Sequence, residues 1–310
     1  MVKFFTLPPD RMDYPYILIN ANHPENGLRY VASHRSSIEA VIIDSGIEIF
    51  RNPSIKEYPG GAEAWIKRLV DLYDRAKKIV PHARVYVTCP DYCDDYHPKS
   101  LWLSDDLTNI ERTILNILMC VDWYSDVDWL IPVQGWNRKP ESLMISLDYL
   151  HQLGVLKNRR YIAIANLCVE PSTEIVRKSV LYVRHWLKIY GYSDTDIHVF
   201  GLKIAALHSI KNMITSFDST AWTRPVSTRL HRVFPWSAKT DEERMLFFIE
   251  YLIRLKRIGV EIPQQTIEEA KRWLDPIKKG LIRRYPTKIR LIEKLIRELR
   301  KELETGKKVS

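Results

Sequence analysis

Short apolar runs and longer amphipathic stretches alternate along most of this chain. Seven runs rich in Ile and Val are the expected strands: Tyr16–Ala21, Ala40–Asp44, Arg84–Thr88, Trp129–Val133, Tyr161–Ala165, Ile197–Phe200 and Met213–Phe217. Apolar residues at helical spacing between them predict helices at Gly61–Ile79, Leu107–Cys120, Pro140–Leu153, Ser172–Ile189 and Lys203–Ser209. Because strand and helix alternate, we expect the strands to be parallel and buried on both faces.

The number of repeats predicts an α/β fold, a closed (β/α)₈ barrel of the TIM type, although the pattern does not place the eighth strand. An open doubly wound sheet is the alternative. Such a sheet usually carries a glycine-rich phosphate loop after its first strand. The segment from Asn20 to Pro24 contains no glycine, so the barrel is favoured.

Beyond Trp236 the pattern changes to helices alone, predicted at Asp241–Leu255, Ile267–Trp273 and Lys288–Glu304. We therefore expect a barrel over residues 1–235 and a helical region over residues 236–310. The net charge is +9, and the residues from Lys239 onward hold 19 Lys and Arg against 12 Asp and Glu. A basic region of this kind suits contact with nucleic acid, with a solvated helical face as an equal alternative.

The sequence also bears on compartment and cofactors. It has no long uncharged apolar run and no secretion signal at its start, so we expect a cytoplasmic protein without a membrane partner. The four cysteines (Cys89, Cys93, Cys120 and Cys168) form no disulfide framework. The spacing of Cys89, Cys93 and His97 does not match a zinc knuckle, so loop thiols are favoured over a metal site.

Two strand-like runs end in a carboxylate, at Asp44 of Asp-Ser-Gly and at Asp218 of Asp-Ser-Thr. All strands of a barrel end at the same face, so polar residues that follow them should converge. The other residues in such positions are Asp91, Gln134, Gly135, Asn166 and Gly201. Carboxylates and amides together can hold a planar polar ligand such as a nucleobase.

Each of these residues also has a purely structural interpretation. Asp44 can be a turn residue at a strand end, and Asp218 can be a helix cap. Asp91 lies in an acidic loop, and Gln134 can bond the backbone. Only their combination favours a site.

Six short motifs follow one another in a familiar order: Asp44-Ser45-Gly46, Cys89-Pro90-Asp91, Val133-Gln134-Gly135, Asn166-Leu167, His198-Val199-Phe200-Gly201, and Phe217-Asp218-Ser219 before Trp222-Thr223-Arg224. From about Ile42 to Arg229 this order resembles the tRNA-guanine (queuine) transglycosylase superfamily. Those (β/α)₈ barrels exchange a guanine in nucleic acid for a 7-deazaguanine. The resemblance therefore implies a nucleic acid and a 7-deazaguanine-type base as partners.

The resemblance implies that Asp218 is the nucleophile at C1′, and Asp44 is our candidate for the acid and base. Two carboxyl groups are what an oxocarbenium-like transition state requires. The implied base-binding residues are Ser45, Asp91, Gln134, Gly135 and Asn166. Three arginines close behind the nucleophile are expected to contact the nucleic-acid backbone: Arg224, Arg229 and Arg232.

The chain also departs from that family. Ile47 and Glu48 replace its second glycine and following aromatic, so the wall that stacks on the base must come from Phe50, Tyr92, Trp136 or Trp222. No cysteine follows Asp218, so the family's zinc site is absent, and we expect neither metal nor redox cofactor.

The missing zinc element, and an Asp-Ser-x-Ala-Trp motif at residues 218–222 that looks like the DNA-modifying, DpdA-like branch, favour DNA over tRNA. The expected function is thus exchange of guanine for a 7-deazaguanine through a covalent Asp-ribosyl intermediate, with a possible homodimer as the assembly. Two alternatives stay open. One is a nucleic-acid-binding barrel without turnover, and the other is a hydrolytic N-glycosidase that uses the same carboxylates.

Overall fold

The computed structural model describes residues 2–52, 54–93, 107–136, 139–167, 170–234 and 236–305. Eight parallel strands form one sheet in the order β1-β8-β7-β6-β5-β4-β3-β2. They are β1 (Lys3–Phe5), β2 (Tyr16–Asn20), β3 (Ala40–Asp44), β4 (Arg84–Thr88), β5 (Trp129–Val133), β6 (Tyr161–Ile164), β7 (Asp196–Val199) and β8 (Ser216–Asp218). A parallel bridge between Thr6 and Ile17 joins β1 to β2. The predicted (β/α)₈ barrel is confirmed.

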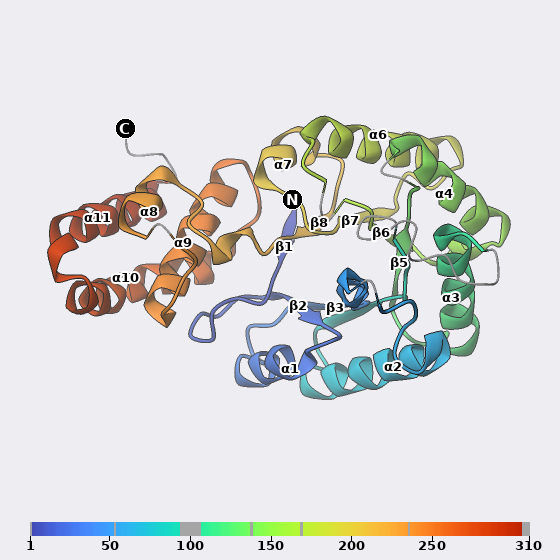
Figure 1. Cartoon of the computed structure of the whole chain (residues 1–310), viewed down its shortest axis with the longest axis horizontal. Coiled ribbons are helices and arrows are strands. Elements are labelled where there is room, and N and C mark those ends of the chain that lie inside the picture. The colour runs from blue at the N-terminus through green and yellow to red at the C-terminus, as the bar shows by residue number, and fades with distance from the viewer. Residues whose placement is uncertain are drawn as a thin grey trace.

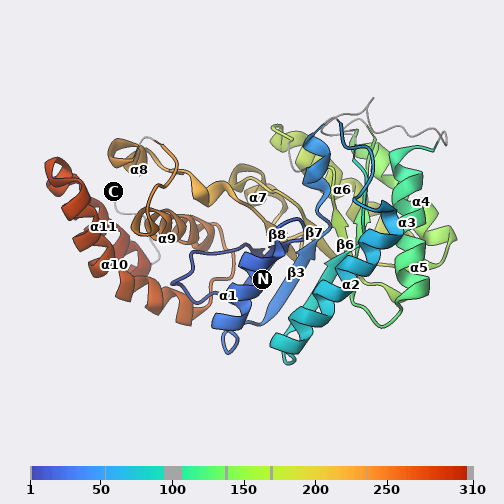
Figure 2. The ribbon, with the colours of Figure 1, turned by 60° about the horizontal axis from the view of Figure 1, so that its bottom comes forward.

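Helices follow the strands and cover the outside of the barrel (Figure 1). They are α1 (Pro24–Ser33), α2 (Gly61–Ile79), α3 (Asn109–Trp123), α4 (Leu143–Gln152), α5 (Val155–Asn158), α6 (Thr173–Ile189) and α7 (Ile204–Ile210). Short 3₁₀ helices are η1 (Ile47–Arg51), directly after β3, η3 (Pro140–Ser142), and η4 (Ala221–Thr223), directly after β8. Figure 2 shows α1 and α2 beside β3. The long helices carry one apolar stripe each, which is buried against the strands.

The eighth strand, which the sequence pattern did not place, is Lys3–Phe5 at the start of the chain. It pairs with β8 in register, with Phe5 beside Asp218. Phe4 is fully buried and stacks on Phe217, with 5.2 Å between the ring centroids. A three-residue strand is too short to show any periodicity, which is why the pattern missed it.

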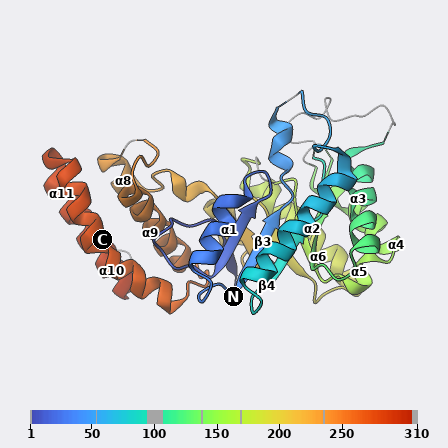
Figure 3. The same ribbon diagram turned by 90° about the horizontal axis from the view of Figure 1, so that it is seen from below.

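The chain ends in a helical region that packs against one side of the barrel (Figures 1 and 3). Helix α8 (Thr228–Val233) leads into it, and the region itself contains α9 (Asp241–Arg257), α10 (Gln264–Arg284), η5 (Pro286–Lys288) and α11 (Ile289–Thr305). Helix α9 is buried along most of its length. Its Phe248 packs edge-on against Tyr14 and Trp222 of the barrel, at 5.6 and 5.2 Å between centroids.

Helix α10 is longer than the pattern predicted, because it continues through Pro276 rather than ending at Trp273. Ile277 and Leu281 beyond the proline are both buried. Their burial holds the helix together past a residue that lacks a backbone N–H. Within the part of the chain that the structure describes, no helix is both long and apolar enough to span a membrane.

Candidate functional site

A cavity of about 690 Å³ lies at the carboxyl ends of the barrel strands. Asp44 and Asp218, which the sequence placed at two strand ends, both line it. Other lining residues come from the ends of β1, β2 and β7, from η1 and η4 and from α9, and include Thr6, Asn20, Glu48, Phe200, Trp222 and Arg244. In a barrel of this type, the carboxyl ends of the strands are where active sites lie.

Asp44 is the last residue of β3, and its Oδ1 accepts a hydrogen bond from the Gly46 N–H at 2.5 Å. Burial raises the pKa of its carboxyl group to about 7, and the nearby charges of Glu48 and Asp218 act in the same direction. The Gly46 hydrogen bond lowers the pKa and offsets part of this rise. Near neutral pH this carboxyl can therefore both give and take a proton.

The turn after Asp44 requires glycine. Gly46 has φ of 81°, and a Cβ there would lie 2.9 Å from Asn22 Oδ1. Asn22 in turn donates a hydrogen bond to the Gly46 carbonyl at 2.9 Å. The Asp-Ser-Gly sequence thus fixes the position of the carboxylate through its own backbone.

Asp218 ends β8, and two groups contact its Oδ1: the Gly201 N–H at 2.9 Å and His198 Nε2 at 3.3 Å. His198 is completely buried in β7, and its Nδ1 lies 2.8 Å from Ser216 Oγ. No residue that the structure describes donates to Oδ2 of Asp218. One carboxylate oxygen is therefore held, and the other is available for chemistry.

A second, buried group of polar side chains lies beside Asp44. Ser45 Oγ donates to Asp91 Oδ1 at 2.6 Å, and Gln134 Nε2 donates to Asp91 Oδ2. Burial raises the pKa of Asp91 to about 6, although both hydrogen bonds lower it. Asp91, Gln134 and Ser45 are not among the residues that line the cavity. Because Ser45 follows Asp44 directly, the two groups are nevertheless neighbours.

Three amide atoms of this group have no hydrogen-bond partner among the described residues: Gln134 Oε1, Asn166 Oδ1 and Asn166 Nδ2. Both side chains are almost completely buried. A buried polar atom without a partner is costly, so native proteins keep few of them. Gly135 leaves the space for Asn166, since a Cβ there would lie 2.4 Å from Asn166 Nδ2. These atoms can bond a ligand that has both donors and acceptors on one edge.

The three predicted backbone-contacting arginines lie in two places. Arg224 lines the main cavity, together with Lys203 and Arg244. Arg229 instead forms ion pairs with three glutamates of α9 and α11, which are Glu250, Glu298 and Glu302. Arg232 lines the same separate cleft as Arg229. Only Arg224 of the three is near Asp218.

Of the four aromatic residues predicted to stack on the base, only Trp222 lines the cavity. Phe50 and Tyr92 are buried and stack on each other at 5.5 Å, and Trp136 is 53% exposed. Trp222 lines the cavity and donates its indole N–H to Thr6 Oγ1 at 2.9 Å. Phe200 is a second aromatic residue of the lining. A base in the cavity would therefore meet Trp222 or Phe200.

Sequence reasoning missed Asn20, Glu48 and the role of His198. Asn20 ends β2, lines the cavity and donates to Glu48. The strand-end argument that found Asp44 would also have found Asn20, whose strand was predicted one residue too long. His198 lies inside a strand, where that argument does not apply.

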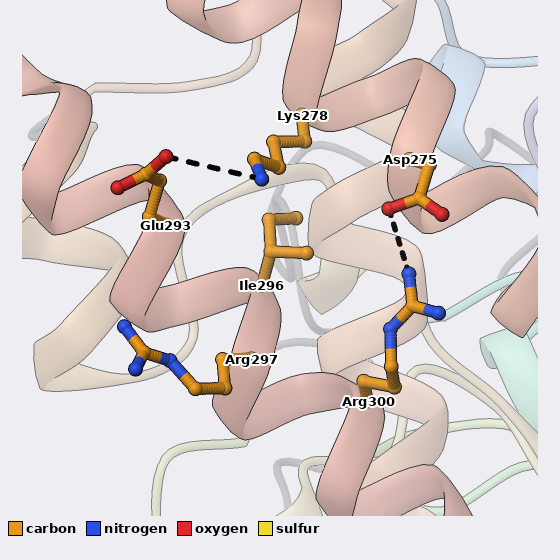
Figure 4. A pocket seen from close by; sticks show the side chains of 6 residues that line it. All are labelled: Asp275, Lys278, Glu293, Ile296, Arg297 and Arg300. Carbon is orange, nitrogen blue, oxygen red and sulfur yellow. Dashed lines mark hydrogen bonds and ion pairs between the residues drawn. The ribbon is translucent and has the colours of Figure 1, made fainter.

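Two further features do not form such a site. The cleft between α10 and α11 is lined by salt-linked side chains, with Arg300 on Asp275 at 2.7 Å and Lys278 on Glu293 at 3.9 Å (Figure 4). Cys89 and Cys93 are buried thiols. The described residues contain no group of three or more His, Cys, Asp or Glu that could hold a metal, while His97 and Cys168 lie outside them.

Fold and site together define a (β/α)₈ barrel with two carboxylates in one strand-end cavity. Comparison with models of known protein families gives no match for this sequence, and comparison with curated proteins gives none either. Support for a function thus comes from the geometry of this cavity together with the motifs of the chain.

Proposed function

We propose that this protein is a base-exchanging transglycosylase that replaces a guanine in nucleic acid with a 7-deazaguanine. The observation that carries the proposal is that Asp44 and Asp218 line one cavity from different sides of the barrel. A buried polar group with unpaired amide atoms lies next to Asp44. Two carboxyl groups in one cavity, with further polar side chains next to one of them, are the equipment for chemistry at a glycosidic carbon.

In the first step, an oxygen of the Asp218 carboxylate attacks C1′ of the target nucleotide. The bond between C1′ and the base nitrogen breaks, and the leaving guanine takes its proton from the Asp44 carboxyl. The ribosyl unit is then held as an ester of Asp218. In the second step, Asp44 takes a proton from the incoming 7-deazaguanine, whose nitrogen attacks C1′ and releases Asp218. Two inversions restore the original configuration, and no electrons are gained or lost.

The other residues support binding. Asp91, Gln134 and Asn166, with Ser45 and the backbone near Gly135, lie next to Asp44 and outside the cavity lining, and they would bond the polar edge of a base that reaches past Asp44. Arg224, Lys203 and Arg244 would contact phosphates at the mouth of the cavity. A base inside a duplex cannot reach such a cavity, so the target must be single-stranded or flipped out. We favour DNA as the substrate because the chain lacks the zinc element that the tRNA enzymes carry.

The direct test is incorporation of radiolabelled guanine into a single-stranded oligodeoxynucleotide or a tRNA transcript. We expect incorporation by the unmodified protein and a loss of roughly 10³-fold or more in Asp218→Asn. Asp196→Asn is the matched control, because Asp196 is an exposed carboxylate at the opposite end of β7. Release of free base without incorporation would indicate a hydrolytic N-glycosidase. Binding without either reaction would indicate a barrel that has lost turnover.

A further inference from the structure

A chain of hydrogen bonds inside the barrel ends on the proposed nucleophile. The Tyr161 hydroxyl lies 2.5 Å from Ser216 Oγ, which lies 2.8 Å from His198 Nδ1. His198 Nε2 then contacts Asp218 Oδ1 at 3.3 Å. The register of β7 against β8 pairs His198 with Ser216, so both side chains enter the same layer of the interior. His198 and Ser216 are almost completely shielded from solvent.

The positions of the hydrogens in this chain follow from counting donors and acceptors. Ser216 has a single hydroxyl hydrogen to donate. Its Oγ is also the only hydrogen-bond partner of the Tyr161 hydroxyl among the described residues. If Ser216 donated to Tyr161, the phenol hydrogen would have no acceptor. His198 Nδ1 would then carry the imidazole hydrogen, and the Nε2 lone pair would face the Asp218 carboxylate.

The opposite direction of donation gives every donor and acceptor in the chain of hydrogen bonds a partner. Tyr161 donates to Ser216, Ser216 donates to His198 Nδ1, and the Nε2–H donates to Asp218 Oδ1. Burial raises the pKa of the Tyr161 phenol, which keeps it a donor at any physiological pH. This chain of hydrogen bonds therefore selects the neutral imidazole of His198 with its hydrogen on Nε2.

We propose that His198 is a positioning residue for the nucleophile, which holds Oδ1 of Asp218 together with the Gly201 N–H and so selects Oδ2 as the oxygen that attacks C1′. This inference rests on the proposed function. Both donors bond the same oxygen, at 3.3 and 2.9 Å, which fixes the plane of the carboxylate. When Oδ2 bonds to C1′, Oδ1 becomes the carbonyl oxygen of the ester and keeps both donors. Because the donating imidazole is neutral, the carboxylate retains its negative charge for the attack.

The test uses two amide variants that differ in reach. The amide nitrogen of His198→Gln can take the place of Nε2, whereas that of His198→Asn lies nearer the place of Nδ1 and cannot reach Asp218. We expect His198→Asn to lower kcat for base exchange by about 10- to 100-fold, because the carboxylate loses its fixed orientation. KM for the incoming base should change less than about twofold, and His198→Gln should restore most of kcat. The free energy of unfolding of both variants is measured alongside, to separate positioning from folding.

A second readout does not depend on activity. In protein labelled with ¹⁵N-histidine, the signals lost in His198→Gln identify the ring of His198. We expect one protonated and one unprotonated ring nitrogen, with the proton on Nε2, and a mixture of tautomers in Ser216→Ala. A proton on Nδ1, an imidazolium, or equal kcat in the two amide variants would overturn the inference. Absence of exchange by the unmodified protein would instead overturn the proposed function, while the tautomer is still decided by the spectrum.

Discussion

Asp44 is partly buried, and its proposed role as acid and base needs two protonation states. Its pKa rises from 3.8 to about 7, chiefly through burial. The folded protein therefore keeps a proton on Asp44 that the unfolded chain has lost between these pH values. Its contribution to stability is fully present below about pH 4 and is lost as the pH rises through about 7.

The replacement Asp44→Asn tests this directly, because the amide cannot ionise. We expect it to raise the free energy of unfolding relative to the unmodified protein at pH 8.5 by on the order of 2 kcal/mol, and to change it little at pH 4. Denaturant titrations at both values measure the difference. Asp71→Asn, which removes an exposed carboxylate on α2, is the matched control for loss of a surface charge. Equal effects of Asp44→Asn at both values would contradict the raised pKa.

Gly135 leaves the space that the Asn166 side chain occupies, so adding a methyl group at residue 135 should displace that side chain. A Cβ would lie 2.4 Å from Asn166 Nδ2 and 3.0 Å from Ser142 Oγ. We expect Gly135→Ala to lower the free energy of unfolding by about 1–3 kcal/mol, because a packed side chain must move. Chemical denaturation measures the loss.

A double-mutant cycle with Asn166→Ala provides the control for Gly135. Asn166→Ala removes the closest atom that the new methyl group meets. Gly135→Ala should therefore cost clearly less in that background than in the unmodified protein. Additive effects of the two substitutions would show that the clash lies elsewhere.

At the scale of elements, the sequence predicted β3, β4 and β5 with their observed bounds. Each has an apolar centre with polar or turn residues at or beside its ends, so both the strand and its bounds are visible in the sequence. The strand β1 shows neither, because its three residues gain their strand conformation from pairing with β8. Local pattern cannot reveal a pairing across more than 200 residues, which depends on the tertiary fold.

The short strand β1 is nevertheless where the barrel closes and where the helical region attaches. Phe4 is fully buried between Phe217 of β8 and Tyr251 of α9, with ring centroids at 5.2 and 5.3 Å. We expect Phe4→Ala to lower the free energy of unfolding by about 3–5 kcal/mol. Arg11→Ala, at an exposed position of the same segment, should change it by less than about 0.5 kcal/mol. Similar losses in both variants would mean that β1 is not part of the core.

The candidate site could be predicted only where it follows from chain direction. Asp44 and Asp218 end strands, so parallel topology alone brings them to one face. The contact of His198 with Asp218 depends on the register of β7 against β8, which no local pattern supplies. The position of Arg229 was not predictable either, because nearness to Asp218 in sequence says nothing of the direction that α8 takes toward α9 and α11.

Across the whole molecule, some arginines form ion pairs with carboxylates and others line the cavity. Arg229 is held by buried glutamates, and Arg300 pairs with Asp275. These two arginines are thus already paired with carboxylates of the helical region. Arg224 and Arg244 line the cavity and are exposed, without an ion pair to any residue that the structure describes. Arg244 belongs to α9, so the helical region contributes directly to the mouth of the barrel.

Under the proposed function, this distribution of cations predicts how binding of single-stranded DNA would depend on salt. Each lost phosphate contact should reduce the slope of log K against log salt by about 0.7. We expect a reduction of this size in both Arg224→Ala and Arg244→Ala, and none in Arg297→Ala, whose side chain lies at the cleft between α10 and α11 (Figure 4). Fluorescence anisotropy of a labelled oligonucleotide between 50 and 200 mM salt, roughly the range over which such contacts are resolved, measures the slopes.

Arg229→Ala, measured in the same salt titrations, tests whether an arginine held in ion pairs also contributes to DNA binding. It removes the partner of Glu250, which is almost completely buried. We expect it to lower the free energy of unfolding by about 3 kcal/mol while leaving the salt slope of the folded protein unchanged. If all four substitutions reduced the slope equally, binding would follow the total charge of the protein, and the mouth of the cavity would not be where the nucleic acid lies. A reduction confined to Arg224 and Arg244 would place the phosphate backbone beside Asp218, where exchange of a base requires it.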